Sequence, residues 1–278
     1  MAVKNQPADA SPVSFLQGVA LNLRRHMVSM ARRQGAGYIA QGLGIADALA
    51  ALYFHELRYD PERPDWPGRD RFLLSTGHYS IALWAVLAEA GVIPVAELES
   101  YGADDSRLDM STLDTTPGVE MIGGSLGHGL GQAVGMALGL RLQASESRVF
   151  VELSDGEMQE GATWEAAMSG GHFGLDNLVA LIDCNGIQAD GEVVLDMEPV
   201  ADKWRAFGWD TVEFDGNDMA QVVNALHYAR NRNGRCKAIV LRTTPGKGVR
   251  TLEQRERAHF VRVDAGEGDA LSAELDRG

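Results

Sequence analysis

The second half of the chain alternates between apolar runs and amphipathic segments. Nearly continuous apolar runs, which are typical of strands buried on both faces of a sheet, lie at residues 148–153, 177–183, 209–214 and 237–242. Segments with helical periodicity lie between them, at residues 157–173, near 201–207 and at 218–231. This alternation predicts an α/β fold, with a mostly parallel sheet, helices on both faces and right-handed crossovers.

The first half is mainly helical in its pattern. Helices are expected at residues 15–34, 45–56, 78–90, 95–101 and 126–143, a strand at 71–75, and a glycine-rich turn at 35–44. Residues 103–124 show no periodicity, which indicates a functional or mobile loop. We expect one domain over residues 14–262, a loosely held N-terminus over 1–13, and a frayed, acidic tail over 263–278.

Composition narrows the function classes. The 278 residues carry a net charge of −14, which disfavours a general role on nucleic acid or at a membrane surface. No apolar run is long enough to span a membrane, and residues 1–14 lack a secretory signal pattern. The two cysteines cannot form a disulfide framework, so we expect a cytoplasmic protein. The four arginines at 24, 25, 32 and 33 indicate a solvated helix face rather than an anion site.

Two polar motifs follow neighbouring predicted strands. Ser154-Asp155-Gly156-Glu157 comes after the first of these strands, and Asp183-Cys184-Asn185-Gly186 comes after the next. Because the carboxyl ends of adjacent parallel strands meet, Asp155 and Asn185 can offer oxygens to one cation. Two protein ligands are few for a metal ion. This suits magnesium, which also takes ligands from a bound phosphate group. The alternative is two ordinary turns, since Asp-Gly and Asn-Gly are common turn pairs.

The stretch around these motifs resembles a known family. LSDGEMQEGATWEAAMSGGHFGLDNLVALIDCNGIQADG (153–191) is similar to the thiamine-diphosphate motif, and more narrowly to that of transketolases. Further similar segments, in the same order, are STGH (75–78), TPGVE (116–120), GSLGHG (124–129), TTPGKGV (243–249) and the later His259. The resemblance covers about residues 15–260 and implies the thiamine-diphosphate-binding fold.

The resemblance implies roles for the matched residues. A magnesium or other divalent cation would be bound by the side chains of Asp155 and Asn185 and by the main-chain oxygen of Ile187. His78 and His259 would line the diphosphate and the reacting face of the cofactor, and Glu160 would join a carboxylate pair across a subunit interface. The remaining residues expected to bind thiamine diphosphate are Gly124, Ser125, Leu126, Gly156 and Glu157.

The sequence departs from the family pattern in three places. Ser154 replaces the first glycine of the Gly-Asp-Gly motif. Tyr38 and, near residues 109–111, Met110 stand where transketolases have histidines that face the ketose donor. We therefore place Tyr38 and Met110 on the substrate side, and expect a donor with fewer hydroxyls or with an apolar group opposite Met110.

The resemblance also implies a partner. The expected chain is the N-terminal subunit of a split enzyme, which forms a heterodimer or heterotetramer with a separate C-terminal subunit. Together they would move a two-carbon ketol unit from a ketose to an aldehyde acceptor. The alternatives are a 2-oxo-acid decarboxylating ligase or dehydrogenase component, a nicotinamide enzyme using Gly-x-Gly-x-x-Ala at 35–40, and a non-catalytic scaffold. A helix precedes residues 35–40 where a nicotinamide fingerprint needs a strand, which disfavours the nicotinamide enzyme.

Overall fold

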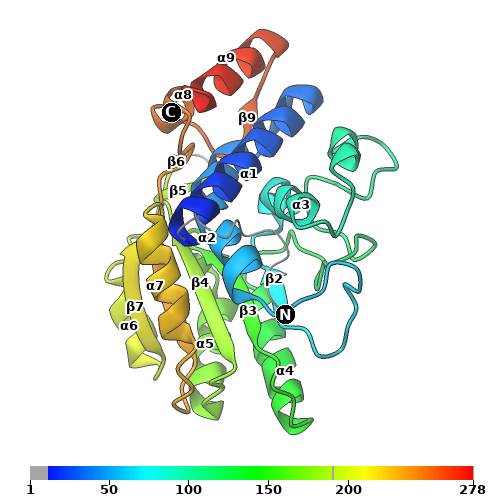
Figure 1. The fold of residues 1–278 in the computed structure, drawn as a ribbon. Helices are drawn as coiled ribbons and strands as arrows, with labels where there is room; N and C mark the ends of the chain where they lie inside the picture. The colour runs from blue at the N-terminus through cyan, green and yellow to red at the C-terminus, as the bar shows by residue number, and fades with distance from the viewer. Residues whose placement is uncertain (1–11, 190, 278) are drawn as a thin grey trace.

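A parallel sheet forms the centre of the protein, which is described by a computed structural model over residues 12–189 and 191–277 (Figure 1). Within these residues the sheet has five strands, all parallel, in the order β2-β3-β4-β8-β7. The strands are β2 (Arg71–Leu74), β3 (Val149–Ser154), β4 (Leu178–Cys184), β7 (Asp210–Asp215) and β8 (Lys237–Arg242). The predicted α/β fold is therefore confirmed.

Helices cover both faces of this sheet (Figure 1). One hydrophobic cluster joins the sheet to α1 (Pro12–Gln34), α2 (Ile39–Ala51), α3 (Ser80–Glu89) and α7 (Met219–Ala229). A second cluster, on the other face, joins it to α4 (Gly129–Leu142), α5 (Gly161–Phe173) and α6 (Val200–Ala206). Phe150 of β3 belongs to the first cluster and Val151 to the second, as the two-residue period of a strand requires. Burial on both faces explains the continuous apolar runs.

The expected glycine-rich turn at 35–44 is wrong in its second half. Helix α2 begins at Ile39, and a π-helical turn, η1 (Leu52–Glu56), continues it. Gly42 lies where α2 meets its neighbours, and a Cβ there would come within 2.8 Å of the Met27 sulfur and 3.1 Å of Ile81. The glycine therefore allows close helix packing, which outweighs its low helix propensity.

Several shorter elements adjust the predicted boundaries. Helix α4 begins at Gly129 rather than at 126, and the expected helices at 95–101, at the start of 78–90 and at the start of 157–173 are 3₁₀ turns. These turns are η3 (Val95–Ser100), η2 (Gly77–Tyr79) and η4 (Glu157–Gln159). Residues 103–124 contain no helix or strand, as their lack of periodicity predicts, and this loop extends over 101–128. The remaining short elements are β1 (Ala36–Gly37), β5 (Ile187–Gln188), β6 (Gly191–Glu192), α8 (Arg250–Glu253) and β9 (Val261–Arg262).

The expected frayed end after residue 263 is wrong. Residues Ala265–Leu275 form helix α9, which packs beside α1 (Figure 1). Asp264 caps this helix by accepting a hydrogen bond from the Glu267 backbone N–H at 2.8 Å. Leu271 and Leu275 are buried against the first cluster. The segment is acidic and rich in small residues, so its two leucines give only a short helical pattern. They lie four residues apart on one helix face.

The arginines of α1 are ion-paired, and one of them is buried. Arg24 lies 2.5 Å from Asp47 of α2 and is only 8% exposed, so the expected solvated face is wrong at this position. Arg25 and Arg32 pair with Asp276 and Asp269, next to α9 and within it. The expected loose N-terminus lies outside the described residues up to position 11, and α1 already begins at Pro12. No described helix is long and apolar enough to cross a membrane.

Replacing Leu271 with alanine tests how tightly α9 is docked. We expect Leu271→Ala to lower the free energy of unfolding by about 2–5 kcal/mol, since it removes a fully buried side chain and leaves a cavity. Urea denaturation followed by circular dichroism measures this loss. Leu142→Ala, at a position that is 80% exposed, is the matched control and should change stability by less than about 0.5 kcal/mol. Equal stability of the two variants would show that α9 is not docked.

Candidate active site

The carboxyl ends of β3 and β4 bring two polar side chains together. Ser154 and Asp183 are register partners, so Asp155 and Asn185 follow at the same edge of the sheet. The two carboxylate oxygens of Asp155 accept hydrogen bonds from the backbone N–H groups of Gly156 at 2.8 Å and Gly186 at 2.7 Å. Asp155 therefore ties the two strand ends together, and its remaining lone pairs are available to a cation.

The side-chain amide of Asn185 is held in one orientation. Its Nδ2 donates to Asp183 Oδ2 at 2.6 Å and to the Tyr79 hydroxyl at 2.8 Å. Asp183 also accepts from Tyr79 and from the Thr243 hydroxyl. With both acceptors on the nitrogen side, Oδ1 of Asn185 is directed away from them, toward its own loop, where the Ile187 N–H donates to it at 3.0 Å. The amide oxygen, rather than the nitrogen, is therefore the group that can ligate a cation.

Buried carboxyl groups of β3 and β4 lie next to this edge of the sheet. Burial raises the pKa of Asp183 to about 7, and burial raises the pKa of Glu152 well above its ordinary value. Glu152 accepts a hydrogen bond from the Thr76 hydroxyl, and its other oxygen has no partner among the described residues. Burial also raises the pKa of Asp155 itself, which bonds from Gly186 and Gly156 partly oppose. A bound cation would favour the charged form of Asp155.

Glycines let the loop after β2 touch the 123–126 segment. A Cβ on Gly77 would lie 2.4 Å from the Gly124 nitrogen and 2.5 Å from the Gly123 Cα, so two backbones are in direct contact here. Gly124 has a φ of +122°, which favours glycine. The hydroxyl of Ser111 is buried without a partner among the described residues, 3.2 Å from the Cβ position of Gly124. Two segments of the 101–128 loop therefore meet the loop after β2 here.

Glu157 is turned into the protein. Its Oε1 accepts from the Ser75 hydroxyl and, at 2.8 Å, from the Gly127 backbone N–H, and its side chain is fully buried. Its own backbone N–H donates to the Ser154 hydroxyl at 3.1 Å. Glu157 thus supports the 124–127 segment, and its contact with the cofactor stays a prediction. Glu160 is exposed, as a residue at a subunit interface would be in a single chain.

Two of the predicted catalytic residues lie in an aromatic cluster, defined by Tyr38, His78, His259 and Phe260. The centroids of the His78 and His259 rings are 5.1 Å apart, and Tyr38 packs edge-on against both, at 4.9 and 5.3 Å. Burial, and then the nearby His259, lower the pKa of His78 to about 4, so this imidazole is neutral at pH 7. The structure thus places Tyr38, predicted on the substrate side, beside His78 and His259.

The other predicted residues are less closely grouped. Met110 is half-buried and packs against the first hydrophobic cluster, while its neighbour Ser111 has the side chain next to Gly124. Ser125 is exposed and Leu126 is half-buried, with the Leu126 carbonyl 2.9 Å from His128 Nδ1. Within residues 109–111, the group that lies beside the 123–126 segment is therefore the Ser111 hydroxyl.

The donor set fits a magnesium ion that shares its coordination with a phosphate ligand. The described residues contain no group of three or more His, Cys, Asp or Glu side chains that could hold a metal. One carboxylate, one amide oxygen and a main-chain oxygen remain, and Mg²⁺ is commonly bound by one or two carboxylates plus substrate phosphates. The close backbone approach at Gly77 and Gly124, and the orphaned hydroxyl of Ser111, are consistent with a ligand at the junction of these loops.

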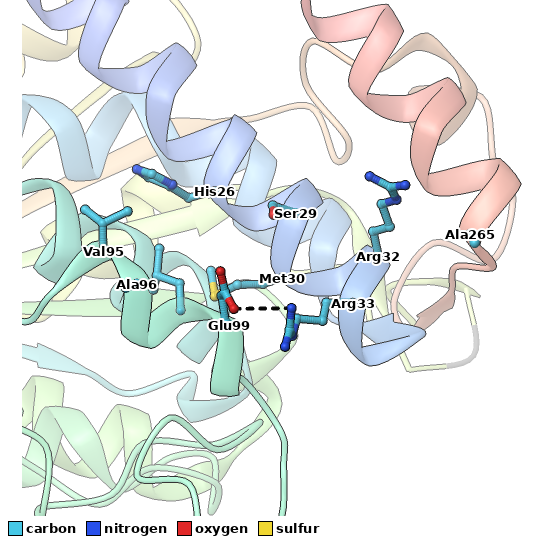
Figure 2. A pocket seen from close by; sticks show the side chains of 10 residues that line it. His26, Ser29, Met30, Arg32, Arg33, Val95, Ala96, Glu99 and Ala265 are labelled. Atoms are coloured by element: carbon cyan, nitrogen blue, oxygen red, sulfur yellow. Dashed lines mark ion pairs between the residues drawn. The ribbon is translucent and has the colours of Figure 1, made fainter.

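A separate hollow of about 440 Å³ lies between α1 and η3 (Figure 2). It is lined by His26, Ser29 and Met30 of α1 and by Glu99 of η3, among others, and shares no residue with the strand-end site. Arg33 pairs with Glu99 at 3.3 Å across it, and Arg32 pairs with Asp269. Because these cations are neutralised by neighbours, the hollow offers no evident anion site.

Sequence reasoning missed several contributors to the site. Asp183 lies within the motif at 183–186, but its hydrogen bond from the Asn185 amide is evident only from the structure. Tyr79 directly follows the predicted His78, and its buried hydroxyl donates to the Asp183 carboxylate at 3.1 Å. Gln41 contacts His259 across 218 residues of sequence, and no local pattern indicates that contact. Residues 35–40 form no nucleotide fingerprint, since β1 is a two-residue strand paired with β9.

Comparisons with known proteins agree with this geometry. The model of the family described as "Transketolase, thiamine diphosphate binding domain" matches residues 17–275. An uncharacterised transketolase family protein of Sinorhizobium fredii is 53% identical over 249 residues, which are 88% of this chain and 89% of that protein. A 6-deoxy-6-sulfo-D-fructose transketolase subunit of Clostridium sp. is 37% identical, with 94% and 96% covered. An apulose-4-phosphate transketolase subunit of Phocaeicola vulgatus is 36% identical, with 83% of each covered.

Solved transketolases share the fold over almost the whole chain. The transketolase of Leishmania mexicana superposes with a TM-score of 0.89 at 28% sequence identity, covering 96% of this chain and 41% of that one. A Pichia stipitis transketolase in complex with sedoheptulose 7-phosphate gives 0.89 at 29% identity. The chain thus spans about two fifths of the length of these solved proteins.

The low pKa of His78 gives a testable pH dependence. Because the folded pKa of about 4 lies below the ordinary value of about 6.5, the unfolded chain binds more protons between these pH values. The free energy of unfolding should therefore fall as the pH drops from about 6.5 to 4, by up to about 3 kcal/mol from this group. Urea denaturation of wild type and His78→Gln across this range isolates the His78 part. An NMR titration midpoint of His78 near 6.5 would contradict the expectation.

Proposed function

Because the chain belongs to the transketolase family, as its thiamine-diphosphate-binding part, we propose that it is one subunit of a split transketolase. The support comes from the lengths of the matched relatives as well as from their sequence similarity to this chain. Relatives named as transketolase subunits are matched over 83–96% of their own length, whereas the solved transketolases are matched over about two fifths. In this proposal a separate C-terminal subunit supplies the pyrimidine-binding domain, and each chain alone is inactive.

The single observation that carries the proposal is that Asp155 and Asn185 directly follow the ends of two adjacent parallel strands, with the Asn185 amide held by hydrogen bonds to Asp183 and Tyr79. Asp155, Asn185 and the main-chain oxygen of Ile187 would hold magnesium, which neutralises the diphosphate of the cofactor. Gly156 would lie against the diphosphate. Thiamine diphosphate, when bound, supplies the electron sink for carbon–carbon bond cleavage. The chain's own task is to bind and orient the cofactor and to keep water from it.

The two histidines of the aromatic cluster suit the reacting side of this site. His78 is held uncharged by burial, so it can donate or accept one hydrogen bond without bringing a positive charge to the cofactor. His259 lies beside it, with the two rings nearly perpendicular, at 87°. We assign both to contacts with the diphosphate and with the hydroxyl groups of the donor. Gly124, Ser125 and Leu126 would pack against the pyrimidine ring at the open side of the chain.

The partner would cover that open side. Gly124, Ser125 and Glu160 are exposed in the single chain, and the adjacent helix α4 has glycines at 131 and 135 whose Cβ positions meet nothing within 4 Å. A second chain can therefore approach this face closely. We assign Glu160 to a carboxylate pair across the interface, in a heterotetramer of two chains of each kind, within the cytoplasm.

The donor side differs from the usual family pattern, because Tyr38 replaces a histidine and the 109–111 loop contributes Met110 and Ser111. Tyr38 packs against Phe260 as well as both histidines, which makes this side more apolar than a histidine would. A ketose with fewer hydroxyls near the cleaved bond would suit it as donor, with an aldehyde as acceptor. The alternative donor is a 2-oxo acid, which would also tolerate an apolar wall.

Loss of the Asp155 carboxylate tests the cofactor assignment. We expect Asp155→Ala to abolish magnesium-dependent binding of thiamine diphosphate, since it removes the one carboxylate of the donor set. Isothermal titration calorimetry on the complex purified from the native host, with and without Mg²⁺, measures this. Asp114→Ala, which removes an exposed carboxylate from the 101–128 loop, is the control and should bind normally. Native mass spectrometry of the same sample should show a heterotetramer with two cofactors, and a cofactor-free chain without a partner would refute the proposal.

Restoring the family histidines tests the donor assignment. We expect the wild-type complex to turn over xylulose 5-phosphate poorly, and Tyr38→His combined with Met110→His to raise that activity at least about tenfold, about 1.4 kcal/mol of transition-state binding. Initial rates with a common aldehyde acceptor measure this. Full wild-type activity on xylulose 5-phosphate would refute the altered-donor hypothesis. Release of CO₂ from pyruvate by the wild type would favour the 2-oxo-acid alternative.

A further inference from the structure

Gln41 is a buried residue that contacts one histidine of the aromatic cluster, His259. Its amide nitrogen is 2.6 Å from Nδ1 of His259, and its side chain is almost wholly buried, at 1% exposed. Gln41 comes from the first turns of α2, and His259 from the loop before β9. None of the family-like segments includes Gln41, and the proposed function gives it no role.

The backbone fixes both ends of this contact. Strand β1, just before α2, pairs antiparallel with β9, so that Gly37 is the register partner of Val261. Val263 N–H donates to Gly35 at 2.9 Å, and Gly246 N–H donates to the Ala40 carbonyl at 2.7 Å. The start of α2 is therefore tied to the loops that follow β8 and precede β9. The distance between Gln41 and His259 is set by these ties.

We propose that Gln41 is a positioning residue that holds His259 as the neutral tautomer with its proton on Nε2. A side-chain NH₂ group can only donate, so the ring nitrogen that it meets must offer a lone pair. A proton on Nδ1 would set two donors against each other inside a buried site. The ring's one N–H donor is therefore on the opposite edge, at Nε2.

The cost of this arrangement argues that it does more than join two loops. Oε1 of Gln41 is buried and has no partner among the described residues, and a buried polar group without a hydrogen bond is unfavourable. An apolar side chain such as methionine would fill the same space without that cost. What methionine would not supply is a directed donor for Nδ1.

The catalytic consequence rests on the proposed function. A His259 ring with its proton on Nε2 presents a single N–H donor, which suits an anionic oxygen of the cofactor or a hydroxyl oxygen of the donor. Tyr38 and His78 pack edge-on against the same ring and limit its rotation. Tautomer and orientation together would pre-form one hydrogen bond to the reacting ligand, so that less reorganisation is needed when the ligand binds.

Long-range ¹H–¹⁵N NMR of the histidine-labelled full chain tests the tautomer directly. In wild type we expect Nδ1 of His259 to have a pyridine-type shift and Nε2 a pyrrole-type shift, with the signals assigned by their loss in His259→Gln. Gln41→Glu, which turns the donor into an acceptor, should exchange the two shifts. Gln41→Met should leave a mixture of tautomers, and it also serves if the buried glutamate prevents folding. Gln254→Glu, at an exposed position, is the matched control.

Rates on the complex with its partner and cofactor then test the consequence. We expect kcat to fall about 10²-fold in Gln41→Glu, within the range that a misplaced catalytic proton costs, while cofactor content and thermal midpoint stay near those of Gln254→Glu. A pyrrole-type Nδ1 in wild type, or unchanged shifts in both Gln41 variants, would overturn the proposal. The expected shifts in a wild-type complex that neither binds thiamine diphosphate nor transfers ketol units would instead refute the proposed function alone.

Discussion

The parallel pairing of β3 with β4 is the constraint on which the rest of the site depends. Their register sets Ser154 beside Asp183, and the next residues along each strand then bring Asp155 and Asn185 to one edge. Each strand is buried along its whole length, so a slip of one residue would exchange the side chains that pack in the two hydrophobic clusters. The hydrophobic core thus fixes the position of the polar ligands. Packing on both faces decides where the strand ends lie, and hydrogen bonds within the site then orient the side chains.

This precision is obtained with buried acids that do not stabilise the fold. Asp183, Glu152 and Glu157 lie beneath or beside the strand ends, and burial raises the pKa of each. A buried carboxyl group is unfavourable unless it is bonded, and one oxygen of Glu152 and one of Glu157 have no partner among the described residues. Their benefit is orientation, because Asp183 turns the Asn185 amide and Glu157 holds the Gly127 backbone. These unfavourable buried groups lower the stability of the fold, but they hold the groups of the site in fixed orientations.

The parts of the protein that could be predicted from sequence are those fixed by local pattern. The strand runs, the order of strand and helix, and the motifs at Asp155 and Asn185 all depend on neighbours in the chain. Helix α9 was missed because its two buried leucines are spaced by a helix turn within an acidic, small-residue segment. The start of α2 was missed because Gly42 reads as a turn residue until Met27 and Ile81 are seen against it. Gln41 was missed because its partner His259 is 218 residues away, and only the fold sets that distance.

Two of the three departures from the family pattern, Tyr38 and Met110, lie where the donor is expected. The proposed cation ligands Asp155 and Asn185 are unchanged, although Ser154 replaces the glycine before Asp155. Tyr38 and Ser111 stand among the groups that would face the substrate in this proposal. An aromatic ring in place of a histidine removes a polar contact at this side, and it also packs against the two histidines that remain. Gln41 then supplies, from behind, the hydrogen bond that orients His259. Such a division follows if the cofactor chemistry is retained while recognition of the donor has changed, because only the substrate side can vary without loss of the cation and diphosphate contacts.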